Sequence, residues 1–273
     1  MAVPPPGGGR ERARREPVFT MAGMESDPTS PLTGGNVSGA ERAGRTVRRE
    51  AGPWTPAVHD FLRWLEGQGL GAIPHVEGTD ADREVLTYVE GRGVPVDREI
   101  VLDNVLEEAV SWLRDFHDIA ADYRPSDPVR WRGGEIELQP DQIICHNDPG
   151  AYNWIIQSGH FVAMIDWDMA GPGDPLDDLA FMAWTAIPLY RPIPQDDVIR
   201  RVNLLVDAYG EWGPLTVMNA VAPRMETACQ RIADGIARED RGMRKLSAAG
   251  EPQRTADRIA AFKERLPEIL EQL

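Results

Sequence analysis

Residues 144–181 read ICHNDPGAYNWIIQSGHFVAMIDWDMAGPGDPLDDLAF, and this stretch decides the fold. Its core is the pattern H-x-D-x-x-x-x-N, which begins at His146 and ends at Asn153. Short apolar runs lie on both sides of the pattern, and the later one ends at Asp166, eighteen residues past Asp148. Apolar runs bounded by turn residues predict short strands that flank a polar loop.

Phosphoryl transfer requires this set of polar groups. One carboxylate must orient and deprotonate the attacking hydroxyl, while a second carboxylate and an amide oxygen must hold magnesium against the nucleotide phosphates. Asp148 and Asn153 are five residues apart and can project from one loop, and Asp166 at the neighbouring strand end can complete the metal site. A lone H-x-D pattern is common by chance, whereas the full pattern followed by this strand is specific.

Together with GPGDPLDDLAF at its end, this stretch resembles the aminoglycoside phosphotransferase family of small-molecule kinases. The resemblance covers roughly residues 31–270. It implies an α+β, two-lobed protein-kinase-like fold, with a small and mostly antiparallel β lobe that carries one helix and a larger, mainly helical lobe. The domains we expect are a disordered tail over residues 1–30, a nucleotide-binding lobe over 31–91, and a catalytic and substrate-binding lobe over 92–273.

The resemblance also implies roles for single residues. Asp148 resembles the catalytic base, and His146 resembles the histidine that supports the catalytic loop. Asn153 and Asp166 resemble the two magnesium ligands. Asp178 resembles an aspartate that binds loop backbone at the start of a helix.

The nucleotide lobe departs from the family pattern. Kinase-like enzymes use a strand lysine, paired with a helix glutamate, on the α- and β-phosphates, but no lysine precedes Lys245. Either Arg48 or Arg49 serves instead, or no residue does, and because side chains alternate along a strand only one of the two arginines points inward. Alignment with the family favours Arg48, and the helix that follows has no glutamate at the expected depth. Further nucleotide contacts are implied at Gly35 and, in the hinge strand, at Leu86 and Tyr88.

Helical periodicity accounts for most of the chain after the nucleotide lobe. Thr55 and Pro56 predict the start of the one helix in the small lobe. The other helices that we expect cover residues 97–118, 176–187, 195–212, 218–239 and a last segment near 254–272. Short strands are expected at residues 142–146, 153–157 and 161–167, and another at 83–90.

Composition narrows the class of protein. The chain has 273 residues and a net charge of −15, which argues against nucleic acid or an anionic membrane as the main partner. Its two cysteines do not make a disulfide framework, and no segment has the charge and apolar run of a secretory signal, so we expect a cytoplasmic protein. We expect a monomer or homodimer, and Met21 and Met24 are alternative starts to Met1.

We therefore predict an enzyme, a phosphotransferase that uses Mg²⁺ and transfers the γ-phosphate of ATP or GTP to a hydroxyl of a small molecule. An aminoglycoside is one candidate acceptor, because nine carboxylates and no lysine or arginine lie between residues 135 and 190. Choline, homoserine, a sugar and a macrolide stay open. One alternative is a catalytically weak kinase-like protein that binds a nucleotide or ligand. Another is a metal-dependent hydrolase built on His146, Asp148 and His160.

Overall fold

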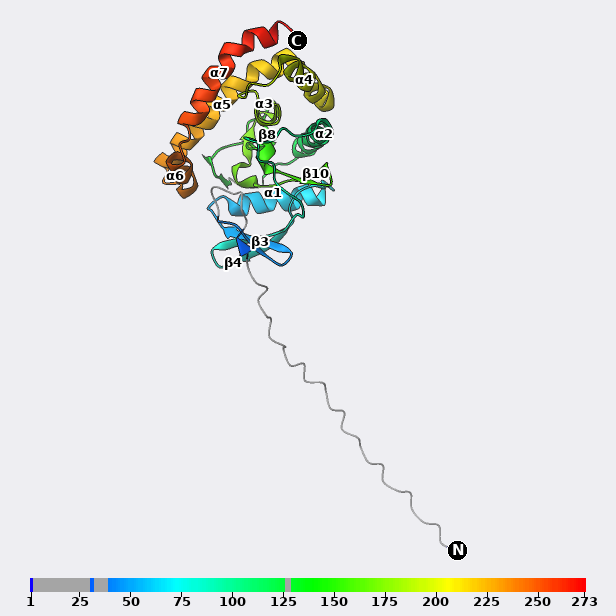
Figure 1. The fold of residues 1–273 in the computed structure, drawn as a ribbon. Coiled ribbons are helices and arrows are strands. Elements are labelled where there is room, and N and C mark those ends of the chain that lie inside the picture. The colour runs from blue at the N-terminus through cyan, green and yellow to red at the C-terminus, as the bar shows by residue number, and fades with distance from the viewer. Residues whose placement is uncertain (2–29, 32–38, 126–128) are drawn as a thin grey trace.

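The protein has a small sheet-based part and a larger, mainly helical part. The computed structural model describes residue 1 and residues 30–31, 39–125 and 129–273. The sheet lies at the bottom of Figure 1 and the helices lie above it, with α1 (Thr55–Gly67) between the two. The predicted α+β class, with one helix on the small antiparallel sheet, is confirmed. The expected tail over residues 1–30 falls almost wholly outside the described residues.

The sheet is antiparallel, with its strands in the order β1-β2-β3-β5-β4. Its strands are β1 (Ser30–Pro31), β2 (Glu41–Ala43), β3 (Thr46–Glu50), β4 (Val76–Asp80) and β5 (Arg83–Thr87). Gly44 has φ of +60° in the turn between β2 and β3, a backbone region that favours glycine. The central pair places Arg49 of β3 directly opposite Glu84 of β5.

Helix α1 packs its apolar face toward the rest of the molecule. Val58, Phe61 and Leu62 are each at most 2% exposed, as the helical spacing predicted. The Thr55 hydroxyl accepts a hydrogen bond from the Gly52 backbone N–H at 2.9 Å and so fixes the turn into the helix.

The helical part holds short strands beneath its helices. The helices are α2 (Asp103–Ala120), α3 (Pro175–Ala186), α4 (Gln195–Tyr209), α5 (Pro214–Ala237), α6 (Arg241–Ala248) and α7 (Gln253–Leu270). The strands are β6 (Arg130–Trp131), β7 (Gly134–Glu135), β8 (Ile143–Cys145), β9 (Trp154–Gln157), β10 (His160–Met164) and β11 (Gly171–Gly173). β9 pairs with β10, and β8 with β11, all antiparallel.

Two helices differ from the sequence expectation. The helix expected over residues 97–118 begins only at Asp103, because the N–H groups of Arg98 and Glu99 bond back to the Pro95 carbonyl and form a turn. Helix α6 was not expected; Asp240 caps it by accepting from the backbone N–H groups of its first turn. In the part of the chain that the structure describes, no helix is long and apolar enough to span a membrane.

Candidate active site

One buried carboxylate, that of Asp178, holds the loop after β8 in place. Asp178 in α3 accepts the backbone N–H groups of His146 and Asn147, each at 2.8 Å. Burial would raise the pKa of Asp178, but a hydrogen bond from His117 at 3.3 Å and nearby positive charge outweigh it and lower the pKa. Asp178 therefore stays ionised and holds the backbone, which is the structural role that the resemblance implied.

His146 connects the loop to the end of β10. Its Nδ1 accepts the backbone N–H of Asp148 at 3.3 Å, and its Nε2 faces the Ile165 carbonyl at 3.2 Å. These partners require the neutral tautomer with the proton on Nε2. Burial lowers the pKa of His146, in agreement with a neutral ring. His146 is thus placed to position Asp148 rather than to contact a substrate.

Asp148 lies at the mouth of the loop with Asn153 beside it. The Asn153 side-chain nitrogen donates to the Asp148 backbone carbonyl at 2.9 Å and to its carboxylate Oδ2 at 3.2 Å. The Tyr152 hydroxyl donates to the other carboxylate oxygen. Burial raises the pKa of Asp148 to about 7, helped by the negative charge of Asp166 and opposed by the Tyr152 hydrogen bond. A carboxyl with that pKa suits general base chemistry near neutral pH.

Asp166 follows β10 in a left-handed backbone conformation, with φ of +64°. Such a conformation is uncommon for a residue with a Cβ and occurs most often at functional sites. The Ile165 backbone N–H donates to the Asn153 carbonyl at 2.9 Å, so the strand end is tied to the loop. Burial would raise the pKa of Asp166, but the Arg49 guanidinium 2.8 Å away keeps it low.

These three side chains line one cavity of about 520 Å³. The structure thus brings together Asp148, Asn153 and Asp166 as the motif spacing predicted. The carboxylate and amide oxygens of these side chains fit Mg²⁺, which prefers oxygen ligands. The Asn153 nitrogen faces Asp148, so its Oδ1 is the amide atom left for a metal, and the Arg49 contact at one oxygen of Asp166 leaves the other.

Arg49, and not Arg48, points inward. Arg49 is 6% exposed and its guanidinium contacts Glu84 at 2.5 Å, Asp166 at 2.8 Å and Asp168 at 2.7 Å. Arg48 is 41% exposed and faces Asp80 at 3.5 Å, so the preference for Arg48 was wrong. The strand register explains the difference, because it places Arg49 opposite the buried Glu84.

The partner of the inward cation comes from a strand. Glu84 lies on β5, is 2% exposed, and contacts His59 of α1 at 2.8 Å through its second oxygen. Helix α1 therefore contributes a histidine, and not a carboxylate, to this buried network. Burial would lower the pKa of Arg49, but Asp168, Asp166 and Glu84 outweigh it and raise the pKa. Arg49 is a permanent cation, and each of its three nitrogen atoms lies within ion-pair distance of a different carboxylate.

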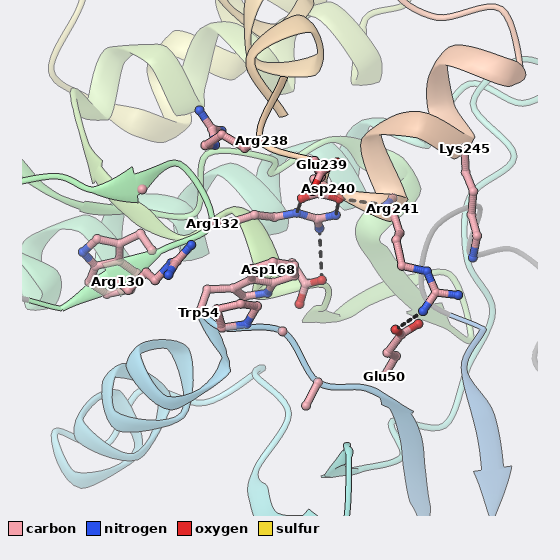
Figure 2. Close-up of a pocket in the computed structure, with 16 residues that line it drawn as sticks. Glu50, Trp54, Arg130, Arg132, Asp168, Arg238, Glu239, Asp240, Arg241 and Lys245 are labelled. Carbon is pink, nitrogen blue, oxygen red and sulfur yellow. Dashed lines mark hydrogen bonds and ion pairs between the residues drawn. The ribbon is translucent and has the colours of Figure 1, made fainter. Parts of the chain in front are cut away.

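A second arginine with a buried side chain, Arg132, contacts the same Asp168 carboxylate (Figure 2). Arg132 donates to Asp168 at 3.1 Å and to both oxygens of Asp240 at 2.8 and 3.0 Å, and it lies over the Trp54 ring at 4.5 Å. Burial and the nearby charge of Asp166 raise the pKa of Asp168 to about 6, although Arg49 and Arg132 oppose this. Arg132 could not be recognised from local pattern, because its partners lie 36 and 108 residues away along the chain.

Of the predicted nucleotide contacts, the structure describes Leu86 and Tyr88 but not Gly35. Leu86 is buried within β5, and the Tyr88 backbone N–H donates to the Arg45 carbonyl at 2.8 Å. That N–H is therefore used inside the lobe and is not free for a base. Gly35 lies outside the described residues.

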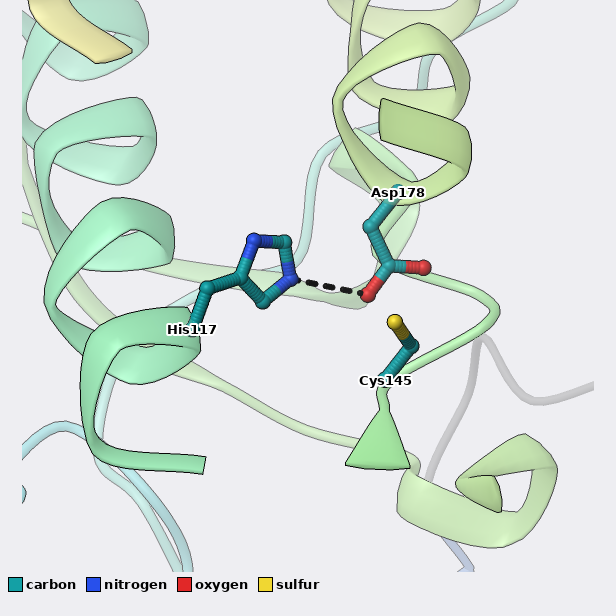
Figure 3. A group of neighbouring side chains, drawn as sticks. All are labelled: His117, Cys145 and Asp178. Carbon is teal, nitrogen blue, oxygen red and sulfur yellow. Dashed lines mark hydrogen bonds and ion pairs between the residues drawn. The ribbon is translucent and has the colours of Figure 1, made fainter. Parts of the chain in front are cut away.

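His117, Cys145 and Asp178 form a buried group whose ligand-type atoms lie within 4.8 Å of one another (Figure 3). Burial raises the pKa of the Cys145 thiol, so it stays protonated, and both oxygens of Asp178 already accept hydrogen bonds. This group packs beneath the loop. His160 of the hydrolase alternative is exposed and contacts Glu108 at 2.7 Å, away from the 520 Å³ cavity.

Comparison with known proteins agrees with this geometry. The model of the phosphotransferase enzyme family matches residues 135–215. The chain is 34% identical over 199 residues to the trifolitoxin immunity protein of Rhizobium leguminosarum bv. trifolii, covering 66% of this chain and 73% of the relative. The chain belongs to the aminoglycoside phosphotransferase family. The predicted enzyme class, a small-molecule phosphotransferase, is confirmed.

Solved structures of an aminoglycoside phosphotransferase and of an amicoumacin kinase share the fold. The gentamicin complex of APH(2'')-IIa matches with a TM-score of 0.57 at 15% identity, over 88% of this chain and 94% of that one. Amicoumacin kinase hAmiN, solved with AMP-PNP and Ca²⁺, matches with a TM-score of 0.59 at 12% identity, over 88% of each chain. The two-lobed kinase-like fold is thereby confirmed.

Proposed function

We propose that this protein transfers the γ-phosphate of ATP or GTP to a hydroxyl of a small molecule, with Mg²⁺ bound between the nucleotide and the loop. The observation that carries the proposal is the meeting of Asp148, Asn153 and Asp166 at one cavity. The nucleotide and divalent ion of the amicoumacin kinase structure support the same reading.

In this proposal Asp148 hydrogen-bonds the acceptor hydroxyl, which displaces Tyr152 from that carboxylate oxygen. The hydroxyl oxygen then forms a bond to the γ-phosphorus, the bond from that phosphorus to the nucleoside diphosphate breaks, and the hydroxyl proton passes to Asp148. A positioned general base contributes a factor of about 10²–10⁴ in rate. Asn153 keeps Asp148 oriented through its side-chain nitrogen.

Asn153 Oδ1 and the Asp166 carboxylate would hold Mg²⁺, which neutralises charge that develops on the phosphates. Arg49 keeps Asp166 ionised and aimed at the cavity. Because Arg49 is already engaged by three carboxylates, its main role in this proposal is to orient Asp166, rather than to bind phosphate as the strand lysine of other kinases does.

Transfer of labelled γ-phosphate tests the proposal. Purified protein is incubated with labelled ATP or GTP and a pooled panel of hydroxylated metabolites and antibiotics, with and without Mg²⁺. We expect a labelled product that needs Mg²⁺ and disappears in Asp148→Asn. A product that forms equally well in Asp148→Asn would refute the role of Asp148.

One observation favours a second function, binding without transfer. The inward cation has no nitrogen group left for phosphate, and the 34% identical relative is called an immunity protein, a role that binding could also fill. Isothermal titration separates the two: nucleotide binding that needs Mg²⁺, with no transfer to any acceptor, supports the binding protein.

A further inference from the structure

The cavity next to Asp148 is lined by slightly more positive than negative side chains, whereas the whole chain carries a net negative charge. Its lining contains more arginines than carboxylates, although the chain carries a net charge of −15. The charged lining residues are Arg98, Arg224, Arg231, Arg254, Arg258, Asp97, Asp148, Asp166 and Glu251. Of the nine carboxylates in residues 135–190, only Asp148 and Asp166 line it. The acidic stretch therefore does not form a receptor for the ammonium groups of an aminoglycoside.

Most of the lining charges neutralise one another. Arg258 donates to Asp97 at 2.9 Å, and Arg254 contacts Glu251 at 2.7 Å. Asp166 has Arg49 as its partner. The first two pairs are partly exposed and in the third the Arg49 side chain is buried, and all three add little net charge to the cavity.

Arg224 and Arg231 are different. They lie seven residues apart in α5, and two helical turns place them on the same face of that helix. Within the described ranges, neither makes an ion pair with a carboxylate within 4.0 Å. Both bond instead to neutral oxygens of Asn147: Arg224 donates to its carbonyl at 2.6 Å, and Arg231 to its side-chain oxygen at 3.0 Å.

Arg224 is 1% exposed, and two of its three nitrogen groups, Nε and Nη1, are buried without a hydrogen-bond partner. Asp148, Asp177 and Asp178 attract it only through space. Burial and the neighbouring Arg224 lower the pKa of Arg231 to about 10, so Arg231 remains a cation at neutral pH. Buried charged N–H groups without hydrogen-bond partners are unfavourable, and a bound anion that accepts from them removes that cost.

We propose that the acceptor carries an anionic group, a carboxylate or a phosphate, which Arg231 and Arg224 bind while its hydroxyl lies at Asp148. This inference rests on the proposed function. Phe181, Trp184 and Tyr190 also line the cavity, so an acceptor with an apolar or aromatic body fits beside the two cations. Arginine suits the task because its planar group binds carboxylates and phosphates through paired hydrogen bonds.

A matched series of small alcohols tests the inference. We would titrate 4-(hydroxymethyl)benzoate, 4-(hydroxymethyl)benzamide and 4-(hydroxymethyl)benzylamine into the full chain by calorimetry, with a non-hydrolysable ATP analogue and Mg²⁺ present. The three share one skeleton and differ only in charge. A hydrogen-bonded ion pair in a buried site predicts that the acid binds about 10-fold tighter than the amide, with the amine weakest.

Arg231→Gln should remove the preference for the acid, whereas Arg114→Gln, on a helix that does not line the cavity, should keep it. Because Arg231 also bonds to the loop, the readout is the ratio of acid to amide affinity, which a purely structural role would leave unchanged. Arg224→Gln serves as the second variant, with melting temperature as the check on folding. Equal binding, no binding, a preference for the amine, or an acid preference that survives in both variants would each overturn the inference.

Failure of the proposed function has a different signature. If no hydroxyl compound is phosphorylated but the acid preference remains and depends on Arg231, then the anion site stands and the transfer reaction does not. If transfer occurs to neutral or cationic acceptors as readily as to acids, then the phosphotransferase stands and the anion site does not.

Discussion

Replacing Arg49 should destabilise the protein strongly and in a pH-dependent way. Arg49→Met removes the shared cation of Glu84, Asp166 and Asp168, whose side chains are 2%, 38% and 10% exposed. Removing one partner of a buried ion pair costs about 3–5 kcal/mol. In the variant, Glu84 still contacts His59, and Asp168 still contacts Arg132. Because these contacts remain, we expect the free energy of unfolding at pH 8 to fall by about 3–5 kcal/mol, the cost of one broken buried pair and not of three.

The sign of the pH dependence follows from linkage. Without Arg49, the folded-state pKa of Asp168, which is already raised, rises further above its unfolded value. The destabilisation of Arg49→Met is therefore largest at high pH and is relieved as the pH falls through the folded-state pKa of Asp168. Asp168 already has a pKa of about 6 with the cation in place. The difference between wild type and Arg49→Met should therefore shrink between pH 8 and pH 5.5.

Urea denaturation followed by circular dichroism measures this difference, with the midpoint and slope fitted at both pH values. Arg48→Met is the matched control, because the neighbouring arginine is exposed and faces only exposed Asp80. Its effect should stay within about 0.5 kcal/mol. The reasoning fails if Arg48→Met costs as much as Arg49→Met, or if the loss for Arg49→Met is the same at pH 8 and pH 5.5.

Three further predictions concern the loop. The kcat/KM for phosphate transfer should rise with pH through about 7, since Asp148 has a pKa of about 7 and must be ionised to act as a base; a flat profile from pH 5.5 to 8.5 would contradict this. Tyr152→Phe removes a hydrogen bond that lowers the pKa of Asp148, so the same pH profile should move to higher pH, and a shift to lower pH would count against the contact. Asp178→Ala leaves two buried backbone N–H groups without an acceptor and should cost about 3 kcal/mol or more in a urea titration, whereas Asp177→Ala should cost far less.

The sequence was sufficient for the motif and for most of the helices, α6 excepted, because both depend on local spacing. The distance from Asp148 to Asn153 is short enough for one loop to carry both, and the strand ending in Asp166 returns to the same place. The role of Asp178 was expected only from the resemblance to the family, because Asp174, and not Asp178, is the N-cap of α3.

The inward cation was not assignable from local pattern alone. Alternation along β3 allows Arg48 or Arg49 to face inward, and only the pairing with β5 decides between them. A clue existed in that strand: Leu86 must face the core, and alternation then puts Glu84 on the same buried face, where it needs a cation. Arg224 and Arg231 were missed because their partners on the loop are about 80 residues away in sequence, beyond any local signal.

The most direct test of the shared site is the Mg²⁺ dependence of ATP affinity, measured by calorimetry on the wild type and three variants. We predict that Mg²⁺ strengthens ATP binding in the wild type and in Asp148→Asn, and that this gain is lost in Asp166→Asn and in Asn153→Leu. A gain that persists in both of the latter variants would contradict the assignment of Asp166 and Asn153 as the metal ligands, and with it the claim that one cavity joins metal, nucleotide and acceptor.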